Sequence, residues 1–234
     1  MSKTLIADNI AKVRQVIEEA AHASGRSPDD VTLVGVCKYF GTDVTHQVAQ
    51  AGLLDLGENR PQQLWDKASM LEDLSIRWHQ IGHLQRNKVR RTLPLIHLFH
   101  AGDSLRLLKE IDKEAARIEV VQDVLLEVNV SGEDAKHGFS PSEMEAVLEQ
   151  CAMLSSVRVR GLMAMAGLHS GLAGAAAEFE SLRELQQKLL PLKPDNIELG
   201  ELSMGMSRDY HIAIEHGATI VRVGSSLFEG LSRS

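Results

Sequence analysis

The chain has 234 residues, 44% of them hydrophobic and 24% charged, enough to bury a core in one large domain or two small ones. Its net charge of −7 argues against nucleic acid as the main partner. The two cysteines, Cys37 and Cys151, have no metal-type spacing and indicate a reducing compartment. The N-terminus lacks the apolar segment of a signal peptide, and no stretch approaches the roughly 18 apolar residues of a membrane span. We therefore expect a cytoplasmic protein without a membrane segment.

The first predicted element is a helix, because Ile6, Ile10, Val13 and Ile17 recur at helical spacing and Gly25 suits the position just beyond its end. From Val31 onward, short apolar runs alternate with helical patterns. The expected strands are Val31–Cys37, Leu53–Leu56, Ile76–Ile81, Leu95–Phe99, Val124–Val130, Val157–Met163, Glu198–Leu202 and Ile220–Val223. The expected helices between and after them are Thr45–Ala51, Pro61–Leu71, Asn87–Leu93, Ser104–Ile118, Ser140–Leu154, Ala173–Leu190 and Arg208–His216.

Eight strand–helix units in about 200 residues are typical of a TIM-type barrel. The pattern therefore predicts an α/β fold, a single (β/α)8 barrel domain over residues 1–234 with an extra N-terminal helix. An open, doubly wound sheet is the alternative, because counting strands does not show that the sheet closes.

Functional groups in such barrels lie at the C-terminal ends of the strands. Lys38 ends the first strand, where an apolar environment favours the neutral amine that forms Schiff bases. The alternative is a lysine that extends its amine to solvent at the rim of the barrel.

Two loops rich in glycine and serine follow the seventh and eighth expected strands, where barrels often bind phosphate. They are Ser203-Met204-Gly205-Met206-Ser207 and Gly224-Ser225-Ser226. Their hydroxyls and accessible backbone N–H groups suit a phosphate dianion, although each could be an ordinary turn.

Arg222 lies inside the apolar eighth strand, where an unpaired charge is costly. It is either half of an internal salt bridge that closes the barrel or the partner of a cofactor ring nitrogen.

Other kinds of site are not indicated. The ten histidines include no His-Glu-x-x-His motif, so we expect no metal site. The basic residues Arg86, Lys88, Arg90 and Arg91 are interpreted as the solvated face of a helix, with nucleic-acid binding as a minor alternative.

Several motifs, in order along the whole chain, resemble the pyridoxal phosphate homeostasis proteins, which share their barrel with the N-terminal domain of alanine racemase. The motifs are Gly57-Glu58-Asn59, Ile81-Gly82-His83-Leu84-Gln85-Arg86-Asn87-Lys88, Arg160-Gly161-Leu162-Met163, Leu202-Ser203-Met204-Gly205-Met206-Ser207 and Val221-Arg222-Val223-Gly224. The resemblance implies pyridoxal 5'-phosphate (PLP) as the cofactor.

The resemblance also implies a role for each site residue. Lys38 would form the Schiff base, Asn59 would lie near the ring, and Arg222 would approach the pyridine nitrogen. Ser203, Gly205, Ser207, Gly224 and Ser225 would surround the phosphate, with Met204 beside it. Lys136 matches a loop lysine that can act as a second PLP acceptor. The chain departs from the family at Tyr39-Phe40, where a small polar residue is usual after the lysine, and at Ser225, where threonine is common.

Three hypotheses for the function remain open. The first is a PLP carrier and buffer without turnover, which passes PLP to apo-enzymes and is expected to be a monomer. The second is an amino-acid racemase, although a cation at the ring nitrogen makes the cofactor a poor electron sink. Racemases of this fold use a tyrosine from a partner subunit and a second domain, which we expect this chain to lack. The third is a barrel that handles phosphosugars and binds no PLP.

Overall fold

The computed structural model describes residues 2–132, 137–167 and 170–231. Within them eight parallel strands pair in chain order, and β1 also pairs with β8, which closes the sheet into a barrel. The strands are β1 (Thr32–Val36), β2 (Asp55–Glu58), β3 (Arg77–Gln80), β4 (Leu98–Gly102), β5 (Gln122–Glu127), β6 (Val157–Met163), β7 (Glu201–Met206) and β8 (Ile220–Val223). The predicted (β/α)8 fold is confirmed, and the open sheet is excluded.

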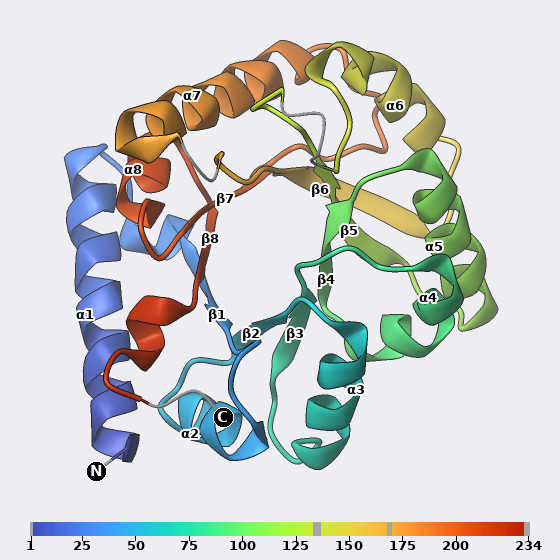
Figure 1. Cartoon of the computed structure of the whole chain (residues 1–234). Coiled ribbons are helices and arrows are strands. Elements are labelled where there is room, and N and C mark those ends of the chain that lie inside the picture. The colour runs from blue at the N-terminus through green and yellow to red at the C-terminus, as the bar shows by residue number, and fades with distance from the viewer. Residues whose placement is uncertain (1, 133–136, 168–169, 232–234) are drawn as a thin grey trace.

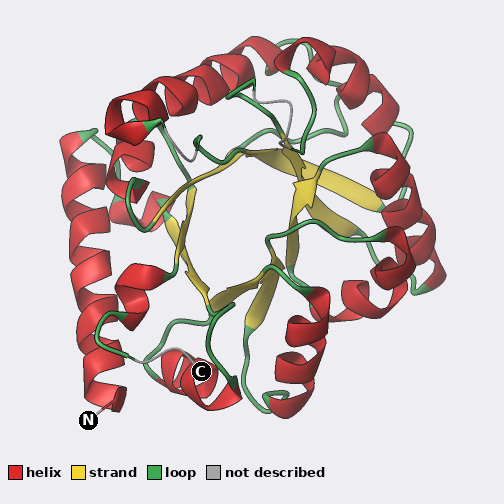
Figure 2. Ribbon diagram, in the orientation of Figure 1, coloured by secondary structure: helices red, strands yellow, loops and turns green. Residues whose placement is uncertain are grey.

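Helices surround the ring of strands (Figures 1 and 2). They are α1 (Ser2–Ala23), α2 (Thr42–Gln50), α3 (Pro61–Met70), α4 (Arg86–Thr92), α5 (Leu105–Arg117), α6 (Met144–Cys151), α7 (Gly171–Leu189) and α8 (Tyr210–Glu215). Short 3-10 turns add η1 (Pro28–Asp30), η2 (Leu93–Leu95), η3 (Pro141–Glu143) and η4 (Ser225–Phe228). None of the helices in the described part of the chain is both long enough and apolar enough to cross a bilayer.

The additional helix α1 packs against α8 and η4 and so covers the junction where the barrel closes (Figure 1). Its predicted apolar stripe, from Ile6 to Ile17, is buried. Asn9 Nδ2 donates hydrogen bonds to the carbonyl oxygens of Leu227 and Glu229, at 3.2 and 3.0 Å. The helix therefore holds the segment that follows β8 in place.

Three strands begin two or three residues later than the apolar pattern predicts, namely β2, β4 and β7. Their bounds include Glu58, His100 and Ser203, polar residues that the sequence placed in loops or left outside strands. All three are buried. The strands tolerate them because the buried polar groups have hydrogen-bond or ion-pair partners in the fold.

The basic residues of α4 lie on its solvated side, as interpreted from the sequence. Arg86, Arg90 and Arg91 are exposed, whereas Val89 is buried. The guanidinium carbon of Arg91 lies 4.1 Å from the centre of the Trp65 ring, a cation–π contact on the surface.

Candidate functional site

Lys38 follows β1 at the C-terminal mouth of the barrel, as predicted. It is half-buried, and its Nζ lies 5.1 Å from the centre of the Tyr39 ring. A cavity of about 540 Å³ opens beside it. Its lining comes from the loops after β1 and β2 and from α2 and α3, and it includes Asn59. The structure therefore places Lys38 and Asn59 on one hollow, as the sequence predicted.

A buried ion pair lies beneath this cavity. The Lys67 ammonium contacts Glu58 Oε1 closely and donates to the Cys37 carbonyl oxygen at 2.9 Å. Burial raises the pKa of Glu58, while the positive charges of Lys67 and Lys38 oppose that shift. Glu58 Oε2 is buried and accepts no hydrogen bond within the described structure. A buried carboxylate thus interacts with two lysines that line the cavity, and sequence reasoning did not single out this group.

The Cys37 side chain, directly after β1, points toward the surrounding helices. Its side chain is fully buried, and burial raises the pKa of the thiol to about 12, despite the nearby Lys67 cation. Thr45 of α2 also interacts with it, so the thiol faces the helix layer. Lys38 follows in the turn after β1 and lines the cavity instead.

The loops after β7 and β8 are tied together. Ser207 Oγ accepts a hydrogen bond from the Gly224 backbone N–H at 3.0 Å, and Ser226 Oγ donates to the Ser207 carbonyl oxygen at 3.4 Å. Gly224 also adjoins the end of β1, since a Cβ placed on it would lie 3.4 Å from the Val36 oxygen. The structure thus brings the predicted loop residues Ser207, Gly224 and Ser225, which begins η4, to the same strand ends as Lys38.

Gly205 allows α8 to approach β7. Its φ is +90°, in the left-handed region, and a Cβ there would lie 2.6 Å from the Ala213 Cβ. Ser203 and Met204 are fully buried within β7, whereas the sequence placed them in the loop with Ser207. The structure thus groups Ser203 with Arg222 in the barrel interior.

Arg222 is buried and donates to neutral oxygens. Its Nη1 donates to the Ser203 carbonyl at 2.8 Å and also to Ser203 Oγ, and its Nη2 donates to the Ala164 carbonyl at 3.0 Å. Burial lowers the pKa of Arg222 to about 10, and the negative charges of Glu127 and Asp209 oppose the shift. At neutral pH the guanidinium remains a cation, and its described hydrogen-bond partners are uncharged.

A row of hydrogen bonds runs from Arg222 through the barrel. Ser203 Oγ lies 2.9 Å from His100 Nδ1, and His100 Nε2 lies 2.8 Å from His79 Nδ1. His79 Nε2 is 3.1 Å from Asp55 Oδ1, which also accepts from Arg77 Nε at 2.7 Å. We call this row the interior hydrogen-bond chain; its members are Arg222, Ser203, His100, His79, Asp55 and Arg77.

The charge of Asp55 fixes which group donates and which accepts at each step of the interior hydrogen-bond chain. Burial opposes ionisation of Asp55, but hydrogen bonds from His79 and Arg77 hold its pKa at about 2, so it is an acceptor. Burial lowers the pKa of His79 and of His100, so both rings are neutral, with one donor and one acceptor each. His79 must therefore donate to Asp55, and His100 to His79. Every proton in the row between Arg222 and Asp55 therefore points away from Arg222, and Arg77 donates to Asp55 from the other side.

A second group of titratable residues lies at the same mouth. Glu127 ends β5, and its pKa is raised to about 7, by burial and by the neighbouring Asp103 carboxylate. His83 Nδ1 lies 2.6 Å from Asp103 Oδ2, and the His137 ring stacks on that of His83. The spacing of these residues along the chain gave no indication of this grouping. Lys136 lies outside the described residues.

Comparison with known proteins agrees with this architecture. The family model described as "Alanine racemase, N-terminal domain" matches residues 6–232. Two relatives are named pyridoxal phosphate homeostasis protein. The one from Aquifex aeolicus is 38% identical over 94% of this chain and 96% of its own length. The one from Pseudomonas aeruginosa is 41% identical over 95% and 94%.

A solved structure is similar over nearly the same span. PipY of Synechococcus elongatus, determined with PLP bound, is 32% identical and superposes with a TM-score of 0.85. The match covers 95% of this chain and 99% of PipY. With a closed barrel, a lysine at the end of β1 and relatives of this identity over nearly the full length, the chain belongs to the pyridoxal phosphate homeostasis protein family, whose barrel is that of the alanine racemase N-terminal domain.

Proposed function

We propose that this chain carries and buffers PLP, which it holds through a Schiff base on Lys38, without catalytic turnover. The observation that carries the proposal is that the tied loops after β7 and β8 adjoin the end of β1, two residues before Lys38. A primary amine and a set of hydroxyl and N–H donors at one barrel mouth suit a phosphorylated aldehyde. The names of the relatives and the PLP-bound PipY structure support the same ligand.

The donor set fits each part of the cofactor. Ser207, Gly224 and Ser225 offer the hydroxyl and N–H groups for the phosphate, and Gly205 lets the backbone bend there. Asn59 lines the same cavity as Lys38, which suits a contact with the cofactor ring. Ser203 and Met204 act from within β7, where Ser203 fixes Arg222 and Met204 fills the core below the loop.

Arg222 is assigned to the pyridine nitrogen, and this favours a carrier over a racemase. Bound PLP supplies a reactive aldehyde and an electron-withdrawing ring. A guanidinium beside the nitrogen disfavours its protonation and so weakens that electron withdrawal. The hydrogen bonds to Ser203 and Ala164 hold the guanidinium in place as a cation. The chain thereby retains PLP without promoting chemistry at an amino acid.

The wider role follows from the same proposal. We infer that residues 1–234 act as one domain, in the cytoplasm and as a monomer, and that apo-PLP enzymes receive the cofactor. Size-exclusion chromatography with light scattering tests the monomer, since a dimer doubles the mass. Transfer is tested by mixing the loaded protein with an apo-enzyme while a scavenger removes free PLP. Recovery of activity faster than the scavenger allows supports direct transfer.

The deciding experiment is the visible spectrum of the purified protein before and after borohydride, with Lys38→Ala and the exposed Lys113→Ala as the matched control. We expect a Schiff-base band that reduction fixes on the peptide containing Lys38, that Lys113→Ala keeps and that Lys38→Ala lacks. A colourless protein that takes up no PLP refutes the proposal and leaves the phosphosugar barrel. Turnover in racemase assays of the same sample would establish the enzyme instead.

A further inference from the structure

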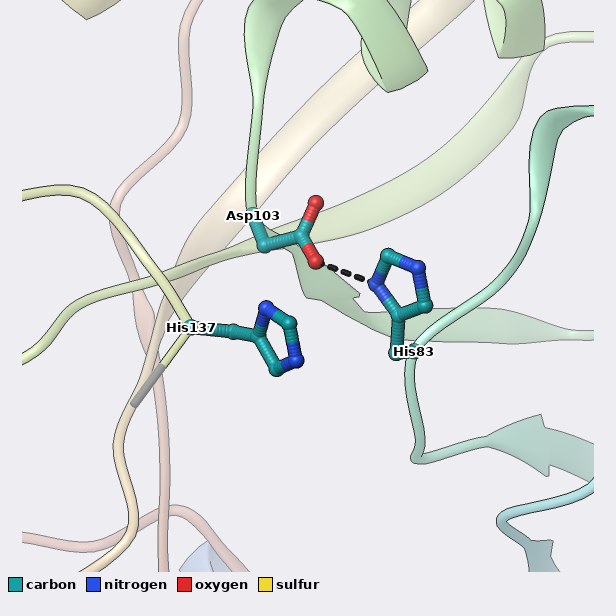
Figure 3. A group of neighbouring side chains, drawn as sticks. All are labelled: His83, Asp103 and His137. Atoms are coloured by element: carbon teal, nitrogen blue, oxygen red, sulfur yellow. Dashed lines mark hydrogen bonds and ion pairs between the residues drawn. The ribbon is translucent and has the colours of Figure 1, made fainter. Parts of the chain in front are cut away.

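Three potential metal ligands meet at the C-terminal mouth, on the loops that follow three consecutive strands. His83 lies between β3 and α4, Asp103 directly follows β4, and His137 lies beyond β5. Figure 3 shows the two imidazoles and the carboxylate turned toward one another. Their nearest ligand atoms all lie within 4.8 Å of each other.

The carboxylate is the fixed point of this group. The Asp103 side chain is only 6% exposed, whereas that of His83 is 48% exposed. The following residue, Ser104, caps α5 by accepting a hydrogen bond from the Leu107 N–H at 3.4 Å. The backbone at Asp103 is therefore anchored between a strand and a helix, and the histidine side chains can adjust around it.

The His83 and His137 rings lie next to each other at the mouth of the barrel. They stack at 4.9 Å between centres and 14° between planes. An unprotonated imidazole exposes the lone pair that binds a metal ion.

We propose that His83, Asp103 and His137 form a binding site for a divalent transition-metal ion of the zinc type. Two imidazoles and one carboxylate are a ligand set that such ions accept, with the remaining positions left to water. Zinc bonds these ligands at about 2.0–2.2 Å, so ligand atoms around one ion lie about 3–4 Å apart. Because the lone pairs lie in the ring planes and those planes are nearly parallel, the exposed His83 and His137 side chains must rotate toward each other to bind one ion.

The test uses the full, tag-free chain, freed of metal by a chelator and titrated with Co²⁺ by visible absorption and with Zn²⁺ by calorimetry. We expect one equivalent of each ion per chain and a Co²⁺ spectrum with nitrogen ligands. His83→Ala, His137→Ala and Asp103→Asn should each weaken Zn²⁺ binding at least about tenfold. His22→Ala, an exposed histidine in the last turn of α1, is the matched control and should bind like the wild type.

His137→Ala keeps the test decisive if another variant fails to fold, because His137 is exposed. Absence of saturable binding to the wild type would overturn the proposal, as would Zn²⁺ affinity that is equal in the wild type, His83→Ala and His137→Ala. Either result would leave an ordinary His83–Asp103 ion pair beneath a stacked ring. The outcome is independent of whether Lys38 binds PLP.

Discussion

Replacing Lys67 by methionine measures how much the positive charge of Lys67 contributes to the stability of the folded protein through its buried pair with Glu58. Methionine keeps most of the length of the side chain but removes the cation and its hydrogen bond to the Cys37 carbonyl. Glu58 would then be a fully buried carboxylate whose nearest cation is gone. Since burying an unpaired charge costs more than protonating it, the folded variant should bind a proton at Glu58.

The free-energy cost of protonating Glu58 sets how much unfolding free energy the Lys67→Met variant loses. Neutralising a carboxyl whose ordinary pKa is 4.5 costs about 3.4 kcal/mol at pH 7 and about 0.8 kcal/mol at pH 5. The lost bond to Cys37 adds about 1 kcal/mol at either pH. In the variant the folded pKa of Glu58 lies above the unfolded value, so its contribution is complete at low pH and is lost as pH rises. The deficit should therefore grow from pH 5 to pH 7 by at most about 2.6 kcal/mol, because the pKa of Glu58 is already raised in the wild type and part of the pH dependence is shared.

Urea unfolding followed by circular dichroism at pH 5 and pH 7 measures this difference. Lys113→Met is the matched control. Because the Lys113 side chain is 63% exposed, this substitution should lower the free energy of unfolding by less than about 1 kcal/mol at both pH values. Adding Glu58→Gln to the Lys67→Met variant removes the titrating group and should abolish the pH dependence. A Lys67→Met deficit that is equal at the two pH values would refute the reasoning and assign the loss to packing.

Other predictions concern buried groups. Both buried cysteines, Cys37 and Cys151, should resist Ellman's reagent at pH 8 until the protein is unfolded, since burial raises the pKa of each thiol to about 12; rapid labelling of the folded protein would contradict this. Gly205→Ala should destabilise more than Gly52→Ala in thermal unfolding, because both have positive φ but only Gly205 has a neighbour at 2.6 Å, and equal losses would count against that contact. His100→Leu should cost about 2–4 kcal/mol in urea unfolding, because it leaves the buried Ser203 hydroxyl proton and His79 Nδ1 each without its partner, and a loss below 1 kcal/mol would contradict the interior hydrogen-bond chain.

Much of the barrel could be predicted because its strands are apolar and its helices are periodic. The bounds Val157–Met163 and Ile220–Val223 were predicted as observed, and the capping box at Ser140 is present, although it opens the turn η3 ahead of α6. The predictions failed by a few residues in β2, β4 and β7. There the barrel interior buries polar residues such as His100, which a one-dimensional pattern assigns to a loop.

The candidate site, like the fold, could be predicted from the sequence only in part. Lys38, Ser207 and Gly224 could be located because each follows a predicted strand, and a barrel gathers strand ends at one mouth. The contact between His83 and Asp103 joins loops 20 residues apart. Such contacts depend on strand register and on closure of the sheet, which no spacing within the sequence encodes.

The direction of the interior hydrogen-bond chain gives the barrel a built-in spectroscopic reporter. It requires His100 and His79 each to hold their proton on Nε2, so both imidazoles are the same tautomer. The ¹⁵N chemical shifts of the two ring nitrogens distinguish that tautomer from the other and from the imidazolium. Any event that withdraws the Arg222 hydrogen bond from Ser203 acts on the first acceptor of the row. NMR of ¹⁵N-labelled His79 and His100 can thus detect, from inside the barrel, a change in the hydrogen bond between Arg222 and Ser203.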